Sequence, residues 1–188
     1  MRKLIYYLNM SLDGYISGPG NDLEVFAPPS EAEHQFANDF LEGADAMIMG
    51  RGMYEIMSYW DGVDPQDQSQ SRVEREFAAI YQANPRYVLS RTLQSVDAKA
   101  TLIREDVAGE IRRLKAGDGS YLALDCGPEL LAECLREGLV DELRILVKPF
   151  VLGAGKRLFG SIEAPLNLRL TSTQVFEAGS VVLTYAVD

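Results

Sequence analysis

The chain has 188 residues, of which 47% are hydrophobic and 24% are charged, and its formal net charge is −10. A chain of this length and composition is expected to fold as one domain over residues 1–188 with its own hydrophobic core, which excludes disordered and fibrous proteins. The acidic excess argues against a nucleic-acid partner and against an anionic membrane surface, and no apolar run approaches the length of a membrane span.

The cysteine and histidine content limits the metal sites that the chain can form and indicates its redox compartment. Cys126, Cys134 and a single histidine are too few for a structural zinc site, so we expect no metal. If both cysteines lie on one helix, they are roughly 12 Å apart and cannot form a disulfide. Cys134 is expected in the core, and Cys126 is expected as an exposed thiol at a pocket. The N-terminal apolar stretch is too short for a signal peptide, and we therefore expect a cytoplasmic protein with reduced thiols.

In the first half of the chain, strand patterns alternate with helix patterns. Ser30–Glu33 is a capping box, which predicts a helix that continues to about Leu41. Apolar residues recur at helical spacing from Met53 to Trp60, and we interpret them as a core-facing stripe. The polar segment 61–70 is expected to be a mobile surface loop. The predicted strands cover 2–10, 15–16, 46–49 and 86–90, and the predicted helices cover 31–41, 53–60 and 71–82.

The second half continues the alternation and then changes to consecutive strands. Asp106 is the expected N-cap of a helix that ends before Gly117, and Pro128 begins a helix that ends at Gly138. The predicted strands cover 101–103, 121–124, 143–147, 167–176 and 181–187. The last two of these form an antiparallel hairpin through the turn 177–180.

This order of elements predicts an α/β fold. Short, nearly continuous apolar strands alternating with helices indicate a mostly parallel central sheet with helices on both faces, and the hairpin adds antiparallel strands at one edge. In such sheets, ligands bind beyond the carboxyl ends of the strands, where the strand order reverses.

Three of the predicted strand ends carry groups that suit an anion. Gly50 and Arg51 follow one strand, Ser90 and Arg91 follow another, and a third strand turns into a helix at 126–128. Each of these turns has an ordinary structural explanation when taken alone. Together they favour an extended polyphosphate ligand such as a dinucleotide. The chain has neither the Gly-x-Gly-x-x-Gly turn of a Rossmann dehydrogenase nor a P-loop.

Several segments resemble known reductases. In chain order, Met10–Ile16 (MSLDGYI), Met49–Arg51 (MGR) and Tyr87–Arg91 (YVLSR) resemble dihydrofolate-reductase-like proteins. Three later segments resemble the reductase domain of the bifunctional riboflavin-biosynthesis deaminase-reductase, namely Gly127–Leu131 (GPELL), Gly138–Leu143 (GLVDEL) and Pro149–Lys156 (PFVLGAGK). The resemblance spans essentially the whole chain and looks like a stand-alone reductase domain, without the zinc-binding deaminase half.

The resemblance implies that NADPH is the cofactor. By their match to the family's Met-Gly-Arg turn, Gly50 and Arg51 are expected to hold its phosphates. Ser90 and Arg91 match the strand end that grips the 2′-phosphate of the adenosine.

Two further regions match cofactor-binding positions of the family. The turn formed by Cys126, Gly127 and Pro128 is expected to lie under the pyrophosphate, and Asn9 and Ile16 are expected to flank the nicotinamide. Dihydrofolate reductases carry a Gly-Gly pair where this chain has Cys-Gly, and a side chain there could crowd the cofactor. The riboflavin-type reductases resemble this turn better.

The implied reaction is hydride transfer to a C=N or C=O group, for which the protein orients the reactants and supplies a proton. Asp125 is expected to face the substrate, although capping the following helix is its ordinary structural function. The family's first-helix carboxylate falls near Glu33 and His34, and Glu33 is better explained by the capping box. His34 is expected as a catalytic residue in contact with the substrate unless it is only an exposed helix residue. Asp13 is expected beside the substrate unless it only forms a turn. Lys156 is expected to meet a substrate phosphate unless it is only solvated.

The sequence therefore predicts a reductase of a small aminopyrimidine or pterin substrate, most like 5-amino-6-(5-phosphoribosylamino)uracil reductase. Dihydrofolate reductase is the alternative within the class, and a non-catalytic nucleotide-binding protein is the alternative outside it. The apolar alternation from Val181 to Val187 and the resemblance to proteins that are commonly homodimers predict a two-fold dimer through the last strands.

Overall fold

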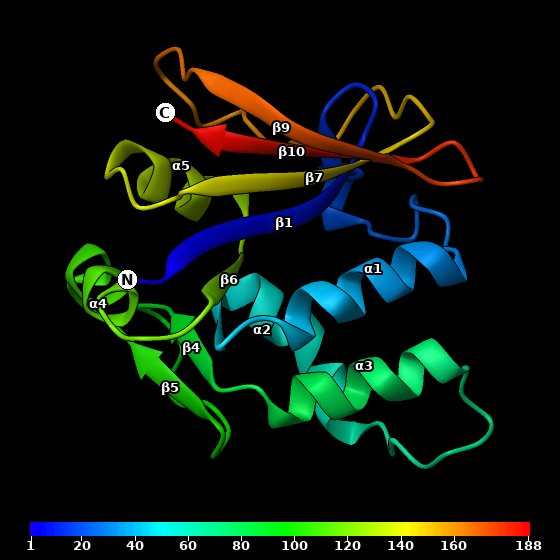
Figure 1. Cartoon of the computed structure of the whole chain (residues 1–188), viewed down its shortest axis with the longest axis horizontal. Helices are drawn as coiled ribbons and strands as arrows, with labels where there is room; N and C mark the ends of the chain where they lie inside the picture. Colours follow the sequence, from blue (N-terminus) through cyan, green and yellow to red (C-terminus); the bar gives the residue numbers. More distant parts are fainter. The chain divides into compact units, whose positions relative to one another are not determined.

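Ten strands and five α-helices follow one another in the computed structural model, which describes residues 1–188 (Figure 1). The helices are α1 (Glu31–Glu42), α2 (Arg51–Met57), α3 (Arg72–Ala83), α4 (Val107–Lys115) and α5 (Pro128–Arg136). The strands are β1 (Lys3–Ser11), β2 (Tyr15–Ser17), β3 (Ala46–Gly50), β4 (Arg86–Leu89), β5 (Ala100–Ile103), β6 (Tyr121–Asp125), β7 (Glu142–Lys148), β8 (Lys156–Arg157), β9 (Leu168–Val175) and β10 (Val181–Val187). Two short 3-10 helices are η1 (Pro19–Asn21) and η2 (Ser58–Gly62).

The chain forms two compact units, each assembled from two stretches of sequence. The first unit contains residues 1–3 and 29–126, and the second unit contains residues 4–28 and 127–188. No helix in either unit has the length and apolar character that a membrane crossing requires.

The strands of the first unit are all parallel, in the order β5-β4-β3-β6. The side chains of Ala46–Met49 in β3 and Leu122–Leu124 in β6 are buried, as expected for parallel strands that are covered on both faces. From β3 the chain passes to β4 and β5 on one side and then returns to β6 on the other side. The strand order therefore reverses at β3, which marks the carboxyl edge beside it as the place to look for a site.

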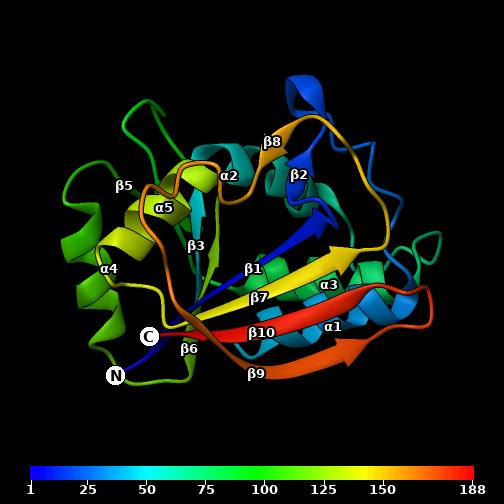
Figure 2. The same cartoon turned by 90° about the horizontal axis from the view of Figure 1, so that it is seen from above.

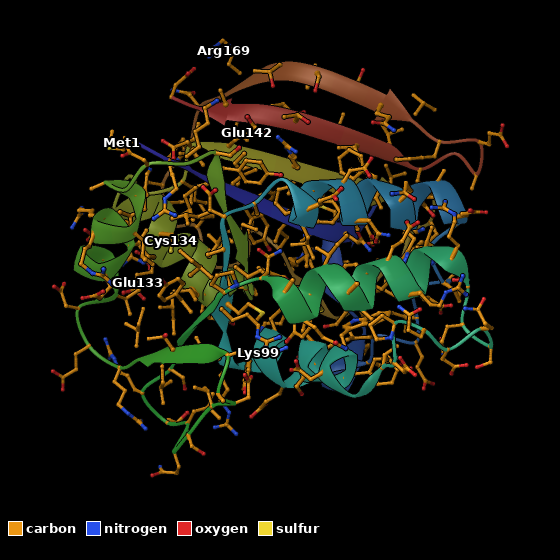
Figure 3. All side chains as sticks on the ribbon, turned by 60° about the horizontal axis from the view of Figure 1, so that its bottom comes forward. Met1, Lys99, Glu133, Cys134, Glu142 and Arg169 are labelled. Carbon is orange, nitrogen blue, oxygen red and sulfur yellow. The ribbon has the colours of Figure 1, made fainter.

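Helices α1 and α3 lie side by side in the first unit (Figures 1 and 3). The predicted capping box of Ser30 and Glu33 begins α1, and an equivalent box of Ser71 and Glu74 begins α3. The buried Asn38 Nδ2 donates a hydrogen bond to the Val73 carbonyl at 3.0 Å, which joins the two helices. The two capping boxes satisfy backbone N–H groups at the helix starts that would otherwise lack partners.

The second unit pairs β1 with β7 in parallel and then adds β10 and β9 antiparallel to them, in the order β1-β7-β10-β9 (Figure 2). All eight residues of β9 are exposed. Strands β2 and β8 form a separate two-stranded antiparallel sheet. Cys134 of α5, labelled in Figure 3, is buried, and burial raises the pKa of its thiol to about 12. The expected α/β class, the C-terminal hairpin and the core position of Cys134 are confirmed.

The interpretation of Met53–Trp60 as a core-facing stripe is wrong. Helix α2 ends at Met57, none of its residues is buried, and Ile56 is 48% exposed. The chain continues as η2, and the tighter 3-10 winding moves Trp60 out of the α-helical stripe. Trp60 instead packs against the Phe77 ring, with 4.7 Å between the ring centroids.

Two smaller differences concern loops. Strand β8 was not expected, because two residues carry no periodic pattern and pair only through the tertiary contact with β2. Within 61–70, the carboxylates of Asp64 and Asp67 accept hydrogen bonds from backbone N–H groups two residues later, which forms local turns. The mobility expected for this segment stays a prediction.

Candidate active site

The carboxyl ends of three parallel strands meet at one edge of the first unit. Gly50 at the end of β3 pairs with Leu89 at the end of β4, and Met49 pairs with Asp125 at the end of β6. This register brings the predicted groups of the three strand ends, Gly50 with Arg51, Ser90 with Arg91, and Asp125, to a common edge. The sequence predicted each of these strand ends, and the register shows that they are adjacent.

Asp125 has the most unusual environment on this edge. Its Oδ1 atom is buried and has no hydrogen-bond partner. Burial raises the pKa of the Asp125 carboxyl from 3.8 to about 7. The N-cap of α5 is Gly127, and no side chain caps the helix, so the helix-capping explanation of Asp125 is wrong. A carboxyl oxygen that is buried at a strand end without a hydrogen-bond partner is typical of a functional group.

Arg51 and Ser90 are connected through Thr92. Arg51 Nη1 donates a hydrogen bond to Thr92 Oγ1 at 3.0 Å, and Arg51 Nε pairs with Glu55 at 2.7 Å. Ser90 Oγ accepts hydrogen bonds from the N–H groups of Thr92 and of the residue after it. Arg91 is exposed at the surface. Two guanidinium groups and two hydroxyl groups are therefore available to an anion at this edge.

The turn that follows Asp125 begins with a buried residue. Cys126 forms no disulfide and has no exposed surface, so the expectation of an exposed thiol at a pocket is wrong. A helix start often exposes its first side chain, but here the chain enters the core before Gly127. The place of Cys126 beside a cofactor, through its backbone, stays a prediction.

Gly127 and Pro128 begin α5 in the second unit. Gly127 has φ −72°, which any residue can adopt, and an added Cβ would lie 3.4 Å from Glu129 Oε2 and 3.7 Å from Lys156 Nζ, in ordinary contact. Neither the backbone nor the protein packing therefore requires a glycine at this position. Lys156 Nζ forms an ion pair with Glu129 Oε2 at 3.2 Å, which brings its cationic group to the turn.

Asn9 and Ile16, the residues expected to flank the nicotinamide, lie in β1 and β2 of the second unit. Asn9 Oδ1 is buried without a hydrogen-bond partner, and Ile16 is half-buried. A buried amide oxygen without a partner is costly, so a ligand N–H group is a suitable partner for it.

Asp13 holds a loop of the second unit in place. Its carboxylate accepts hydrogen bonds from the N–H groups of Leu152 at 3.0 Å and Gly153 at 2.8 Å and from Ser11 Oγ at 2.7 Å. The first of these bonds contributes most to lowering the pKa of Asp13 to about 2, so the group stays ionised. These contacts give Asp13 a structural function, and its catalytic function stays a prediction.

His34 lies in an aromatic cluster of the first unit. The centroid of its ring is 5.4 Å from that of Phe77 and 6.1 Å from that of Trp60. Burial lowers the pKa of His34, and its Nδ1 atom is buried without a partner. The neighbouring Glu33 carboxylate accepts a hydrogen bond from the Ser30 N–H, as the capping-box prediction required. A catalytic role of the neutral imidazole stays a prediction.

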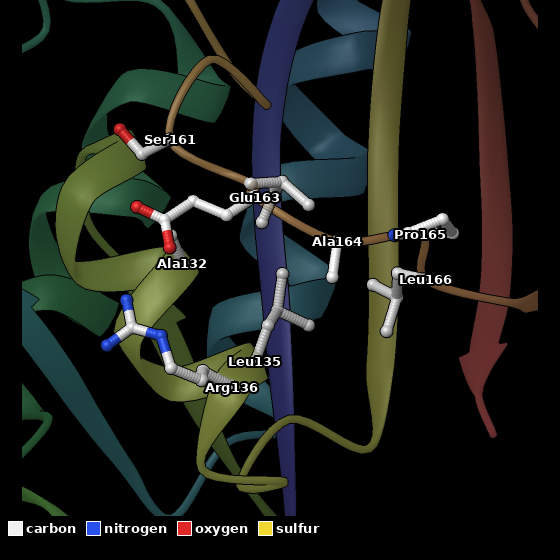
Figure 4. Close-up of a pocket in the computed structure, with 9 residues that line it drawn as sticks. Ala132, Leu135, Arg136, Ser161, Glu163, Ala164, Pro165 and Leu166 are labelled. Carbon is white, nitrogen blue, oxygen red and sulfur yellow. The ribbon is translucent and has the colours of Figure 1, made fainter.

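A cavity of about 220 Å³ lies elsewhere in the second unit, between α5 and residues 161–166 (Figure 4). Its lining is mainly aliphatic, with Leu135, Ala164 and Leu166 among its walls and Arg136 and Glu163 beside it. None of the residues that the sequence analysis selected lines this cavity.

The predicted residues fit a bound dinucleotide and substrate in two respects. The unpartnered oxygens of Asp125 and Asn9 are hydrogen-bonding groups that the protein itself leaves unused. Gly127 has no side chain at a position where neither the backbone nor the protein packing needs a glycine, which permits a ligand to approach the backbone closely. Reasoning from sequence missed the contacts of Asp97 with Arg86 and Tyr54, because no local pattern connects these three residues.

The sequence pattern of the RibD C-terminal domain family matches residues 2–182. The uncharacterised protein YyaP of Bacillus subtilis is 29% identical over 184 residues, covering 98% of this chain and 94% of YyaP. A protein assigned to riboflavin biosynthesis from Shewanella sp. PV-4 has a structure similar to this one, with a TM-score of 0.75, 25% identity and 99% coverage of both chains. Dihydrofolate reductase from Enterococcus faecalis, complexed with NADP(H), shares the fold with a TM-score of 0.64 at 12% identity, over 99% of this chain and 96% of the reductase. The chain belongs to the RibD C-terminal domain family, a family of NAD(P)H-dependent reductases with the dihydrofolate-reductase-like fold.

Proposed function

We propose that this chain is an NADPH-dependent reductase of a small aminopyrimidine, most like 5-amino-6-(5-phosphoribosylamino)uracil. The observation that carries the proposal is Asp125, whose Oδ1 atom is buried without a hydrogen-bond partner at the edge where the strand order reverses. Its surroundings at the neighbouring strand ends supply the cationic and hydroxyl groups that a phosphorylated cofactor needs.

The cofactor-binding residues that the sequence predicts would hold NADPH. Arg51, Ser90 and Arg91 would bind the adenosine 2′-phosphate and its neighbours, and the backbone at Gly127 would lie against the pyrophosphate. Asn9 would accept a hydrogen bond from the nicotinamide amide group. When bound, NADPH supplies the hydride. The fold shared with a dihydrofolate reductase complexed with NADP(H) supports this assignment.

Asp125 would supply the proton. With a pKa of about 7, its carboxyl group is largely protonated below neutral pH and can donate a proton to the nitrogen of a C=N group or the oxygen of a C=O group. Hydride addition to the carbon and proton donation to the heteroatom together complete the reduction by two electrons. The Asp125 carboxylate left by this step regains its proton from solvent before the next turnover.

The position of the Lys156 ammonium group supports a phosphorylated substrate better than it supports folate. Its ammonium group lies beside the α5 turn and could exchange Glu129 for a substrate phosphate. A folate substrate would need a carboxylate from the first helix, and the Glu33 carboxylate is occupied by the Ser30 N–H. The aminopyrimidine is therefore the better-supported substrate, and dihydrofolate is the comparison that a substrate screen should include.

We also propose a cytoplasmic location and a two-fold dimer. Neither cysteine of the chain forms a disulfide, which is consistent with a reducing compartment. The dimer rests on the exposed strand β9.

The cofactor assignment is tested by titrating the protein with NADPH and NADH and following the fluorescence of the nicotinamide. NADPH should bind at least about tenfold more tightly, and Arg91→Ala should weaken NADPH binding by about 1.5 to 3 kcal/mol, the strength of a charge-assisted hydrogen bond, with little effect on NADH. Arg113→Ala, which removes an exposed guanidinium on α4, is the matched control and should change neither affinity. Equal affinity of the wild type for the two nucleotides would remove the assignment.

The reaction itself is tested by following the oxidation of NADPH with the aminopyrimidine and with dihydrofolate in parallel. Turnover with the aminopyrimidine supports the proposal, and turnover with dihydrofolate alone selects the alternative. Tight NADPH binding with no oxidation by either compound would instead support a non-catalytic nucleotide-binding protein.

A further inference from the structure

The guanidinium of Arg86 is a buried charge in the first unit, and its side chain has no exposed surface. Nη1 pairs with Asp61 at 3.0 Å, Nη2 pairs with Asp97 at 3.0 Å, and the guanidinium lies 4.5 Å from the centre of the Tyr81 ring. A buried cation is tolerated only when it is paired, so both carboxylates are held at fixed positions. Arg86 thereby joins β4 to η2 and to the loop between β4 and β5.

Tyr54 holds the same loop from α2. Its hydroxyl donates a hydrogen bond to Asp97 Oδ2 and accepts one from the Asp97 N–H, both at 2.9 Å. The Asp97 Oδ1 atom, which pairs with Arg86, also accepts a hydrogen bond from the Lys99 N–H at 2.7 Å. The Asp97 carbonyl also accepts a hydrogen bond from the Ala100 N–H at 3.2 Å. Every polar atom of Asp97 is therefore engaged, and the far end of the loop is fixed to both α2 and β4.

These contacts lie next to the anion-binding groups. Arg51 is three residues before Tyr54 on α2, and Ser90 and Arg91 begin the loop that Asp97 anchors. The helix and the loop are thus bridged twice, by Arg51 with Thr92 and by Tyr54 with Asp97. The first bridge uses a group that would bind the cofactor, and it must yield when an anion takes Arg51. The second bridge uses no group that would bind the cofactor, and it would keep the two segments at a fixed separation.

We propose that Tyr54, Asp97 and Arg86 are positioning residues that set the distance between Arg51 and the Ser90–Arg91 pair, and thereby the preference for a ligand with a 2′-phosphate. The inference rests on the proposed function, since it assigns those three anion-binding residues to the 2′-phosphate. Loss of the bridge should not remove any group that touches the phosphate. It should instead let the loop move away from α2, so that one phosphate no longer meets both arginines.

The test uses two fragments of the cofactor and no turnover. Calorimetry measures the affinities of adenosine 2′,5′-bisphosphate and of 5′-AMP for the wild type and for Tyr54→Phe, which removes the hydroxyl that bonds Asp97 and keeps the ring. We expect the wild type to prefer the bisphosphate at least about tenfold, and Tyr54→Phe to lose most of that preference while its affinity for 5′-AMP stays within about twofold. Tyr121→Phe also removes a tyrosine hydroxyl hydrogen bond within the first unit, to the Phe40 carbonyl, and should keep the preference.

The possible results separate the two proposals. A preference in the wild type that Tyr54→Phe retains would overturn the positioning role and leave the proposed function standing. A wild type without any preference would overturn the 2′-phosphate assignment itself, and the positioning role with it. Asp97→Asn provides a second variant, which should lose the preference as Tyr54→Phe does. Faster amide exchange of residues 90–99 in both variants, with unchanged exchange in α3, would show that the loop was released and the unit remained folded.

Discussion

At the end of β6, burial raises the pKa of the Asp125 carboxyl to about 7, so this group can act as a proton donor. We predict that Asp125→Asn lowers turnover by one to two orders of magnitude, a loss of roughly 1.4 to 2.7 kcal/mol in transition-state stabilisation, because an amide cannot donate a proton. NADPH affinity should stay within about twofold, since the carboxyl group would face the substrate. In the wild type, kcat should fall as pH rises through about 7, and a flat profile would contradict this role.

The same carboxyl group predicts a pH dependence of stability. The folded state keeps the Asp125 proton up to about pH 7, whereas the unfolded chain loses it near 3.8. The folded state therefore binds more protons between these values, and the free energy of unfolding falls as pH rises through this range. The amide side chain of Asp125→Asn has no proton to lose in this range, so the stability of this variant should not show this fall. The melting temperature of the variant minus that of the wild type should therefore be larger at about pH 8 than at about pH 5. A helix-capping aspartate would make the variant less stable at both pH values.

At the residue scale, the sequence predicts which groups lie at strand ends but not how they are surrounded. Asp125 and Gly127 could be selected because a strand, a polar residue and a helix start follow one another locally. The raised pKa of Asp125 depends on burial by residues distant in the chain. Arg86 shows the limit clearly, because its carboxylate partners are 25 and 11 residues away and nothing in the strand around it marks a buried charge.

The turn between β6 and α5 carries a prediction at the scale of an element. Gly127→Val should abolish NADPH binding, because the branched side chain would fill the space beside the protein backbone in which the cofactor is expected to lie. The variant should fold normally, since φ at this position is −72° and a Cβ meets only ordinary contacts. Fluorescence titration and thermal melting measure the two effects separately.

Gly138→Ala provides the contrasting control for this experiment. Gly138 has φ +62° and open space around it, so an added side chain strains the backbone without a steric clash. This strain arises at Gly138 and not at the turn that contains Gly127. It should lower the melting temperature and leave NADPH affinity unchanged. Normal NADPH binding by Gly127→Val would mean that the cofactor lies elsewhere.

Elements with strong local signals were predicted well, and elements set by tertiary contacts were not. The capping box of Ser30 and Glu33 located the start of α1 because it uses residues three apart. The helix after β3 was misjudged because its winding changes at Ser58, which hydrophobic spacing alone does not reveal. Strand β8 exists only through its pairing with β2, a contact between segments far apart in the chain.

At the scale of the whole molecule, alternation of strands and helices predicted the α/β class and the antiparallel C-terminal hairpin. It did not predict the strand order, because several orders satisfy the same alternation. The family resemblance supplied what periodicity could not, and the match over residues 2–182 confirms it.

The edge strand β9 underlies the last prediction, which concerns assembly. In the second unit β9 pairs only with β10, and its eight residues are all exposed, with Leu170 at 52% and Val175 at 72%. Arg169, labelled in Figure 3, is the one charged residue of the strand, and Asp188 lies 3.7 Å from it, which weakens the charge that would discourage pairing. A long exposed edge with apolar side chains and a neutralised charge favours association with another strand.

We therefore expect a two-fold dimer in which the β9 strands of two copies pair antiparallel, because a two-fold contact uses the same surface on both protomers. Light scattering at micromolar concentration should give the mass of a dimer for the wild type. Leu170→Lys should shift the mass to that of a monomer, because it places a charge on the pairing edge. Ala178→Lys adds the same charge at an exposed residue of the turn 177–180 and should remain a dimer. A dimer that survives Leu170→Lys would place the contact on another surface, and a monomeric wild type would remove the dimer altogether.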